Sequence, residues 1–198
     1  MLAKEEGINQ NDPYKLVEVV ATNTFERVKS EQSQLENNPD KLKEILQAEL
    51  LPYVDHRFAA FKVLGKYVRN VPREQLIEYV DVFREYLVDS YTVGLSYYED
   101  QEVEFEPATN FSNKKSVTVK ATIKDDVRPD ILLAFKMRKT RDGSWKAFDL
   151  VAEGISMISS KQSQYEPILR KHGVEEVIRI MKSEINSSLT AKNQIAAK

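Results

Sequence analysis

Hydrophobic residues recur at two different spacings along this 198-residue chain. Up to about residue 95 they return every three or four positions, which is the spacing of one face of an α-helix. Between about residues 102 and 152 they alternate with polar residues, as in a half-exposed β-strand. The helical spacing returns from Met157 onward. The pattern therefore predicts helices, then an antiparallel sheet, then helices, in one α+β domain.

Six helices are predicted, and most are bounded by a capping residue, a proline or a glycine. They are expected over about 13–35, 42–50, 55–67, 73–95, 157–171 and 174–185. Asp12 and Asp55 stand at N-cap positions, and Pro13 suits a first helical turn. Gly173 is expected to end the fifth helix. The helix over 73–95 has the widest apolar face, which is typical of a central helix that contacts several neighbours.

Four strands are predicted between the two groups of helices. They are expected near 102–106, 117–124, 131–138 and 145–152, with a hairpin turn at Arg141–Ser144 between the last two. We expect a curved four-stranded antiparallel sheet wrapped by about six helices, NTF2-like in outline. No repeat or low-complexity linker divides the chain, so we predict a single domain over residues 1–198, ordered over about 13–185, with frayed tails.

Composition excludes several classes of function. The net charge is −2, so no basic surplus indicates nucleic-acid binding. There is no cysteine, which excludes disulfides and thiolate chemistry. No stretch approaches the roughly 20 apolar residues of a membrane span. The segment Met1–Gln10 shows no signal-peptide pattern.

The candidate chemical groups are few. Asp55, His56 and Arg57 form the only compact cluster of acid, histidine and base, and could in principle perform general acid–base catalysis. Adjacent residues at a helix start point in different directions, so we interpret Asp55 as a cap and His56 as a surface residue. His172 precedes Gly173 and is interpreted as a helix-terminal residue. No spacing matches a metal site, a phosphate loop or a nucleophile motif. We predict no enzyme, no catalytic residue, no metal and no cofactor.

Basic side chains gather on the polar face of the predicted sheet and at its ends. They are Lys114, Lys115, Lys120, Lys124, Lys136, Arg138, Lys139 and Arg141. Both a docking surface for an acidic partner and an ordinary solvated face are compatible with this pattern.

The surplus of large apolar residues is the most informative feature. Ordinary core packing and a cavity for an apolar ligand are both compatible with it, and periodicity does not separate them. The candidate ligand-binding residues are Phe58, Leu64, Val80, Phe83, Leu87, Tyr91, Val119, Leu133, Phe135, Phe148, Leu150, Ile155 and Met157. Lys62, Lys66, Arg69 and Lys161 are candidates for contact with an anionic group of a ligand or with a partner.

Several segments together resemble the MlaC (toluene-tolerance) family of periplasmic phospholipid-binding proteins. They are Leu51–Asp55, Val63–Tyr67, Trp145–Asp149 and Glu153–Met157, and the similarity extends from about Pro13 to Ile185. The most specific portion is Trp-Lys-x-Phe-Asp followed by Glu-Gly-Ile-Ser. Lys161 stands where the family usually has an arginine, and Tyr165 where it has a phenylalanine.

The resemblance implies a periplasmic shuttle without covalent chemistry. A protein of this family carries a phospholipid between an outer-membrane lipoprotein–porin complex and an inner-membrane MCE-domain ABC transporter, and so maintains outer-membrane lipid asymmetry. It implies a single lipid-binding domain around an apolar cavity. It also implies a monomer that contacts membrane complexes only transiently and binds no nucleic acid. The residues leave three alternatives open: a carrier of another small apolar molecule, a protein adaptor, and an enzyme that uses Asp55 and His56.

Overall fold

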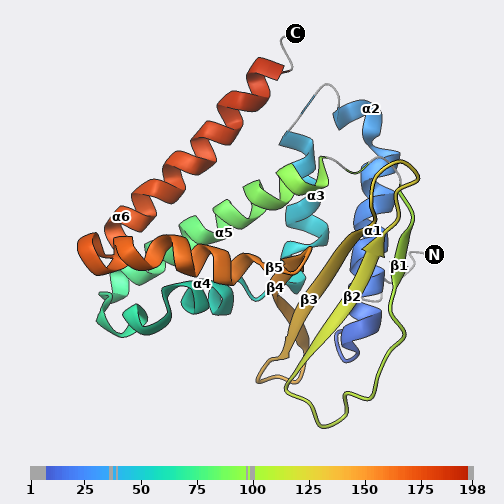
Figure 1. Ribbon diagram of the computed structural model, residues 1–198, viewed down its shortest axis with the longest axis horizontal. Helices are drawn as coiled ribbons and strands as arrows, with labels where there is room; N and C mark the ends of the chain where they lie inside the picture. Colours follow the sequence, from blue (N-terminus) through green and yellow to red (C-terminus); the bar gives the residue numbers. More distant parts are fainter. Residues whose placement is uncertain (1–7, 36–37, 39, 97, 99–100, 196–198) are drawn as a thin grey trace, which may run out of the picture.

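The structure, a computed structural model, describes residues 8–35, 38, 40–96, 98 and 101–195, and the side chains of those up to 185. Figure 1 shows a twisted sheet with α1 (Pro13–Ser30) behind it, and a group of helices beyond the sheet edge formed by β4 and β5. The second part of α6 extends away from this group toward the C-terminus. The α+β architecture predicted from the sequence is confirmed.

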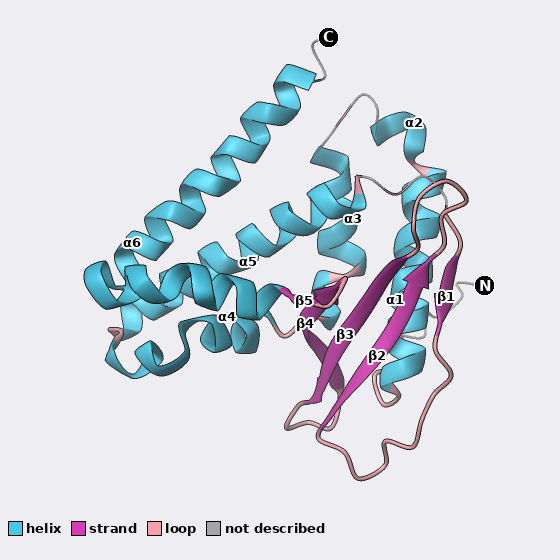
Figure 2. Cartoon of the chain, in the orientation of Figure 1, coloured by secondary structure: helices cyan, strands magenta, loops and turns pink. Residues whose placement is uncertain are grey.

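The sheet is an antiparallel meander in chain order. Its strands are β1 (Val103–Phe105), β2 (Ser116–Ile123), β3 (Ile131–Lys139), β4 (Trp145–Ala152) and β5 (Ile155–Ser156), drawn in magenta in Figure 2. All four predicted strands are present, and β5 is an addition. Glu153 and Gly154 both have positive φ, of 50° and 79°, and form the two-residue turn that brings β5 back onto β4. With only two residues, β5 is too short to show an alternation in the sequence.

The predicted helices correspond to the observed ones in order but not one to one, because the first is divided into α1 and α2 and the last two both lie within α6. The observed helices are α1, α2 (Gln32–Leu35), α3 (Asp40–Glu49), α4 (His56–Leu64), α5 (Arg73–Leu95) and α6 (Met157–Ile195), with 3-10 turns η1 (Leu51–Tyr53) and η2 (Gly65–Asn70). The first predicted helix is divided, because α1 ends at Ser30. The helix predicted over 55–67 begins as α4 and tightens into the 3-10 turn η2 at Gly65, where φ is +55°. The break expected near 37–40 falls partly outside the described residues.

Local signals explain most of the helix ends. The Asp12 carboxylate accepts hydrogen bonds from the backbone N–H groups of Tyr14 and Lys15, at 2.9 and 3.1 Å. The Asp55 carboxylate likewise accepts from Phe58 N–H at 3.0 Å. Gly173, with φ of 78°, interrupts α6 where the sequence predicts a helix end. The helix then continues to Ile195, past the predicted end at residue 185, and residues 196–198 lie outside the description.

The buried hydrophobic residues form three separate clusters. The helical cluster joins α4, α5 and α6 around Tyr79, Phe83 and Tyr165. A second cluster packs α1 on the sheet around Trp145, and a third joins α1 and α3 around Ile45. A single domain usually has one contiguous core. Ala147 of β4 packs against both the helical cluster and the cluster around Trp145, so these two clusters meet at the sheet.

Candidate functional site

A cavity of about 420 Å³ lies between the inner face of the sheet and the helices α1, α3 and α5. The helical part of its wall includes Leu16, Val17, Val20, Ala21, Thr24, Phe25, Leu46, Leu50, Ser90, Tyr91, Gly94, Leu95 and Met157. The sheet contributes Ile123, Ile131, Leu133, Phe135, Met137, Ala147, Phe148, Leu150 and Ala152. The volume lies within the range of about 300–1,000 Å³ that is usual for ligand pockets.

The cavity borders all three hydrophobic clusters. Leu16 and Val17 belong to the cluster around Trp145. Leu95 packs against the cluster around Ile45, and Tyr91 and Leu50 pack against the helical cluster. Side chains that belong to these clusters, or that pack against them, therefore form part of the cavity wall.

Strand β3 shows how the sequence builds the wall. Ile131, Leu133, Phe135 and Met137 alternate along the strand, and all four line the cavity. Because successive side chains of a strand point to opposite faces, the residues between them, such as Lys136, face the other way. The Lys136 ammonium indeed lies 2.9 Å from an Asp149 carboxylate oxygen and is partly exposed.

The polar groups on the wall are largely paired within the protein. The Thr24 hydroxyl donates to the Val20 carbonyl at 2.7 Å. The Tyr98 hydroxyl donates to the Gln101 carbonyl at 3.1 Å. Burial raises the pKa of Tyr91, with a smaller contribution from the Asp149 charge, so this phenol stays neutral. The wall thus offers hydrocarbon surface and no ionised group that lacks a partner.

Asp149 joins the cavity wall to the start of α6. Its carboxylate accepts from the Ser156 hydroxyl at 2.6 Å and from Ile158 N–H at 3.1 Å, in addition to the Lys136 pair. Ser156 accepts in turn from Ser159 N–H at 3.1 Å. Asp149 and Ser156 therefore cap α6 together and hold it against β4. Both residues belong to the motif that carries the family resemblance, and their role here is structural.

Six of the thirteen predicted ligand-binding residues lie on the cavity wall. They are Tyr91, Leu133, Phe135, Phe148, Leu150 and Met157. Contact with a ligand stays a prediction for these six.

The other seven are not among the residues that line the cavity. Leu64, Phe83 and Leu87 are buried in the helical cluster, and Val80 packs against it. Val119 is buried in the cluster around Trp145. Phe58 packs edge-on against the wall residue Phe148, with ring centroids 5.2 Å apart. Ile155 is 61% exposed on β5. Helical spacing, or alternation in the case of Val119, identified the inward side of these residues, except at Ile155. It did not show that other side chains fill the space in front of them.

The contribution of α1 and α3 to the wall was not predicted from the sequence. Val17, Val20 and Phe25 of α1 and Leu46 of α3 all line the cavity. Their helical spacing was visible in the sequence. No feature of the sequence indicated that these helices, rather than α4, face the inner side of the sheet.

The four predicted cationic residues lie away from the large cavity. None of Lys62, Lys66, Arg69 and Lys161 is among the residues that line it. The Lys161 ammonium lies 3.2 Å from the Glu184 carboxylate and 4.6 Å from the centroid of the Tyr86 ring. Lys161 therefore ties the two parts of α6 together. Lys62 and Arg69 are exposed on α4 and η2.

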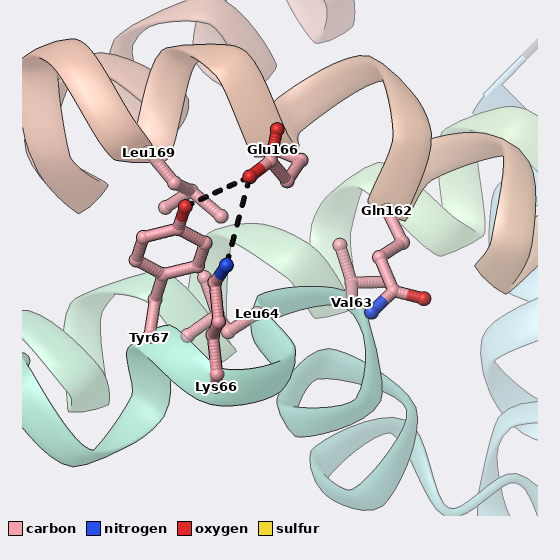
Figure 3. Close-up of a pocket in the computed structure, with 7 residues that line it drawn as sticks. All are labelled: Val63, Leu64, Lys66, Tyr67, Gln162, Glu166 and Leu169. Atoms are coloured by element: carbon pink, nitrogen blue, oxygen red, sulfur yellow. Dashed lines mark hydrogen bonds and ion pairs between the residues drawn. The ribbon is translucent and has the colours of Figure 1, made fainter.

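Lys66 borders a second, smaller pocket of about 270 Å³ between η2 and α6. Figure 3 shows Lys66 and Tyr67 both directed at Glu166, with Val63, Leu64 and Leu169 around the pocket. The Tyr67 hydroxyl donates to Glu166 at 3.0 Å, and the Lys66 ammonium lies 3.9 Å from the same oxygen. Lys66 is 77% exposed, so this ion pair is solvated and weak.

The cluster at residues 55–57 has structural partners rather than catalytic ones. Asp55 caps α4 and forms an ion pair with Arg138 of β3. The interpretation of Asp55 as a cap is confirmed, but His56 is half-buried, and its Nδ1 has no hydrogen-bond partner among the described residues. Burial, followed by the charge of Arg84, lowers the pKa of His56. Within the described part of the chain, no group of three or more His, Cys, Asp or Glu could hold a metal ion.

The predicted basic face is partly neutralised. Lys136 pairs with Asp149, Arg138 with Asp55, and Lys124 with Glu104 and Asp130. Searching the described residues finds no helix with the length and apolar character needed to cross a bilayer.

Comparison with known proteins relates this architecture to one family. The family model described as MlaC protein matches residues 18–183. The intermembrane phospholipid transport system binding protein MlaC of Haemophilus influenzae is 29% identical over 191 residues, which cover 95% of this chain and 89% of that protein. The toluene tolerance protein ttg2D of Pseudomonas putida is 23% identical over 166 residues, covering 81% and 74%.

A solved structure shares the fold. It is a phospholipid-binding protein from Ralstonia solanacearum in complex with a phospholipid, with a TM-score of 0.81 at 17% identity. The alignment covers 90% of this chain and 99% of that one.

Proposed function

The chain belongs to the MlaC family, and from that premise we propose that it binds a phospholipid and carries it between the inner and outer membranes. Its work on the outer membrane would be to maintain lipid asymmetry. The proposal places it in the periplasm, as a single lipid-binding domain that performs no covalent chemistry. The phospholipid is its cargo and not a cofactor.

The apolar cavity between the sheet and α1, α3 and α5 is the observation that carries this proposal. A diacyl lipid has on the order of 30 methylenes, and each buried methylene contributes about 0.8 kcal/mol. Exposing both tails to water would therefore cost roughly 20 kcal/mol. The cavity wall, formed mainly by apolar side chains, can offset the part of that cost that belongs to the hydrocarbon the cavity encloses.

The free energy of moving acyl chains from a bilayer into such a cavity is close to zero, because both environments bury the same hydrocarbon. Direction must then come from partners with different affinities or from a source of energy. We propose an inner-membrane MCE-domain ABC transporter complex and an outer-membrane lipoprotein–porin complex as these partners. We further propose that the protein contacts them transiently and as a monomer.

The test is recovery of the cargo. Protein purified without detergent should yield about one phospholipid per chain on solvent extraction and mass spectrometry. A cavity-filling change, Leu95→Trp, should greatly reduce this yield. The matched control is Ile77→Trp on the same helix, because Ile77 is 55% exposed and is not a wall residue.

Two results would reject the proposal. One is absence of lipid from the wild-type protein even after incubation with phospholipid vesicles. The other is recovery of a different apolar molecule, which would instead support a carrier of another ligand class. Equal lipid recovery from Leu95→Trp and Ile77→Trp would place the cargo outside this cavity.

A further inference from the structure

The entrance of the cavity can be located from the exposure of its wall. Of the described wall residues, only Gly94 on α5 and Ile131 on β3 are exposed, and the others are buried or half-buried. Ile131 is 42% exposed. The cavity therefore reaches solvent where the last turn of α5 and the first residue of β3 border it.

The chain keeps these two rims at the same end of the molecule. Residues 96–102 connect the end of α5 to β1, and Lys124 N–H donates to the Glu102 carbonyl at 2.8 Å. Val103 pairs with Ile123, and Ile123 pairs with Ile131, so Glu102 and the start of β1 lie beside the strand ends that carry Ile131. In Figure 1 the C-terminal end of α5 and the loop between β2 and β3 both lie toward the top of the view.

Neither the backbone conformation nor the packing at position 94 requires a glycine there. Gly94 is the penultimate residue of the α-helix α5, and its φ is not in the left-handed region that requires glycine. A glycine in a helix is destabilising relative to alanine. A Cβ built at Gly94 would meet no atom within 4 Å, whereas one at Gly65 would lie 2.9 Å from Gln162 Nε2. What the missing side chain of Gly94 supplies is open space at the cavity.

The neighbouring turns of α5 support this interpretation. Ser90, Tyr91, Gly94 and Leu95 of α5 all line the cavity, which is the spacing of one helical face, and Tyr98 lines it just beyond the helix. Larger residues on this face cover the interior of the cavity. Gly94 is the position on the face where the wall meets solvent.

We propose that Gly94 and Ile131 form the entrance through which acyl chains reach the cavity, and that Gly94 keeps it open at a cost to helix stability. This inference rests on the proposed function. It names the route of the lipid, which the proposed function leaves open.

The experiment substitutes Gly94 with Ala, Leu and Trp and measures lipid uptake and stability separately. Delipidated protein is mixed with phosphatidylethanolamine–phosphatidylglycerol vesicles that contain a trace of pyrene-labelled phospholipid, and the uptake rate is followed by pyrene fluorescence. Gly94→Ala and Gly94→Leu should raise the urea midpoint, because both are better helix formers than glycine. Gly94→Trp should slow uptake by about tenfold, with Gly94→Leu between it and wild type, because entry would then require α5 to move.

Controls separate blockage from misfolding. Ile77→Trp, on an exposed face of α5, should take up lipid at the wild-type rate. Gly94→Leu tests the proposal if Gly94→Trp does not fold. Ile131→Ala in the Gly94→Trp background should restore part of the rate by widening the opposite rim.

Wild-type uptake rates in both Gly94→Leu and Gly94→Trp would overturn the entrance while leaving the proposed function intact. A failure of Ile131→Ala to restore any uptake would remove Ile131 from the rim and overturn the proposed pair. A wild-type protein that takes up no lipid would overturn the proposed function and the entrance with it.

Discussion

Along most of its length α5 buries Tyr79, Phe83 and Leu87 against α4 and α6, whereas its last two turns present Ser90, Tyr91 and Gly94 to the cavity. The two regions of this helix have similar apolar spacing in the sequence. They differ in what the fold places opposite them. In the first region, side chains from two helices fill the available space. In the second, α1, α3 and the sheet leave a space that no described side chain fills.

The comparison shows that burial and cavity lining are separate properties. Leu87 and Tyr91 are one helical turn apart on adjoining parts of the same face. Leu87 is 8% exposed inside a packed cluster, and Tyr91 borders the cavity. A residue that contacts side chains on all sides contributes to stability, whereas one that faces a cavity is available to a ligand.

The largest expected effect compares truncation in the two regions. Phe83→Ala should lower the free energy of unfolding by about 3–5 kcal/mol, because Phe83 is 2% exposed and its removal opens a new void. Phe135→Ala should cost the lipid-free protein only about 1–2 kcal/mol, because one side of that ring already faces the cavity. Urea unfolding of both variants, after delipidation, measures the difference. Equal costs would mean that the space beside Phe135 is as well packed as the helical cluster.

A smaller effect is expected at the junction between the two regions. Asp149→Ala should lower the free energy of unfolding by about 2–3 kcal/mol, because it removes the acceptor for Ser156, Ile158 N–H and Lys136. Lys136 is 38% exposed and can be solvated after the change. Ser156→Ala, which removes one of these donors, should cost about 1 kcal/mol. If unfolding curves show that Ser156→Ala destabilises the protein more than Asp149→Ala does, Asp149 is not the main cap of α6.

The smallest effect concerns pH and His56, at the start of α4. Burial lowers the pKa of His56 in the folded protein below its ordinary value of 6.5. As the pH falls through that value, the unfolded chain binds a proton at His56 that the folded protein does not. Acidification should therefore destabilise the wild type through this residue. The stability of wild type minus that of His56→Gln should fall between pH 7.5 and 5.5, as measured from urea midpoints. A difference that stays constant or grows would show that His56 is not held neutral by its surroundings.

The sequence predicted the elements well because their signals are local. Asp12 and Asp55 cap helices as expected, Gly173 breaks α6, and the alternation from Ile131 to Met137 forms one face of β3. The strand β5 was missed because its two residues are positioned by the turn at Glu153 and Gly154.

The cavity wall could be predicted only in part, because it depends on contacts between distant segments. The alternation of β3 and β4 indicated the inward face on which Leu133, Phe135 and Leu150 line the cavity, and their contact with a ligand stays a prediction. Phe83 and Val119 have equally apolar patterns but face filled space. The sequence pattern did not indicate a role for Gly94, because that role depends on the cavity that forms where α5 packs near the sheet.

The most direct test of the account asks where the acyl chains lie. The protein would be loaded with a phosphatidylethanolamine that carries a diazirine in one acyl chain, irradiated, digested and mapped by mass spectrometry. We predict adducts on peptides that contain residues 90–98, 131–137 and 147–152, which line the large cavity. Adducts concentrated on residues 63–67 and 162–169, around the smaller pocket of Figure 3, would contradict the account.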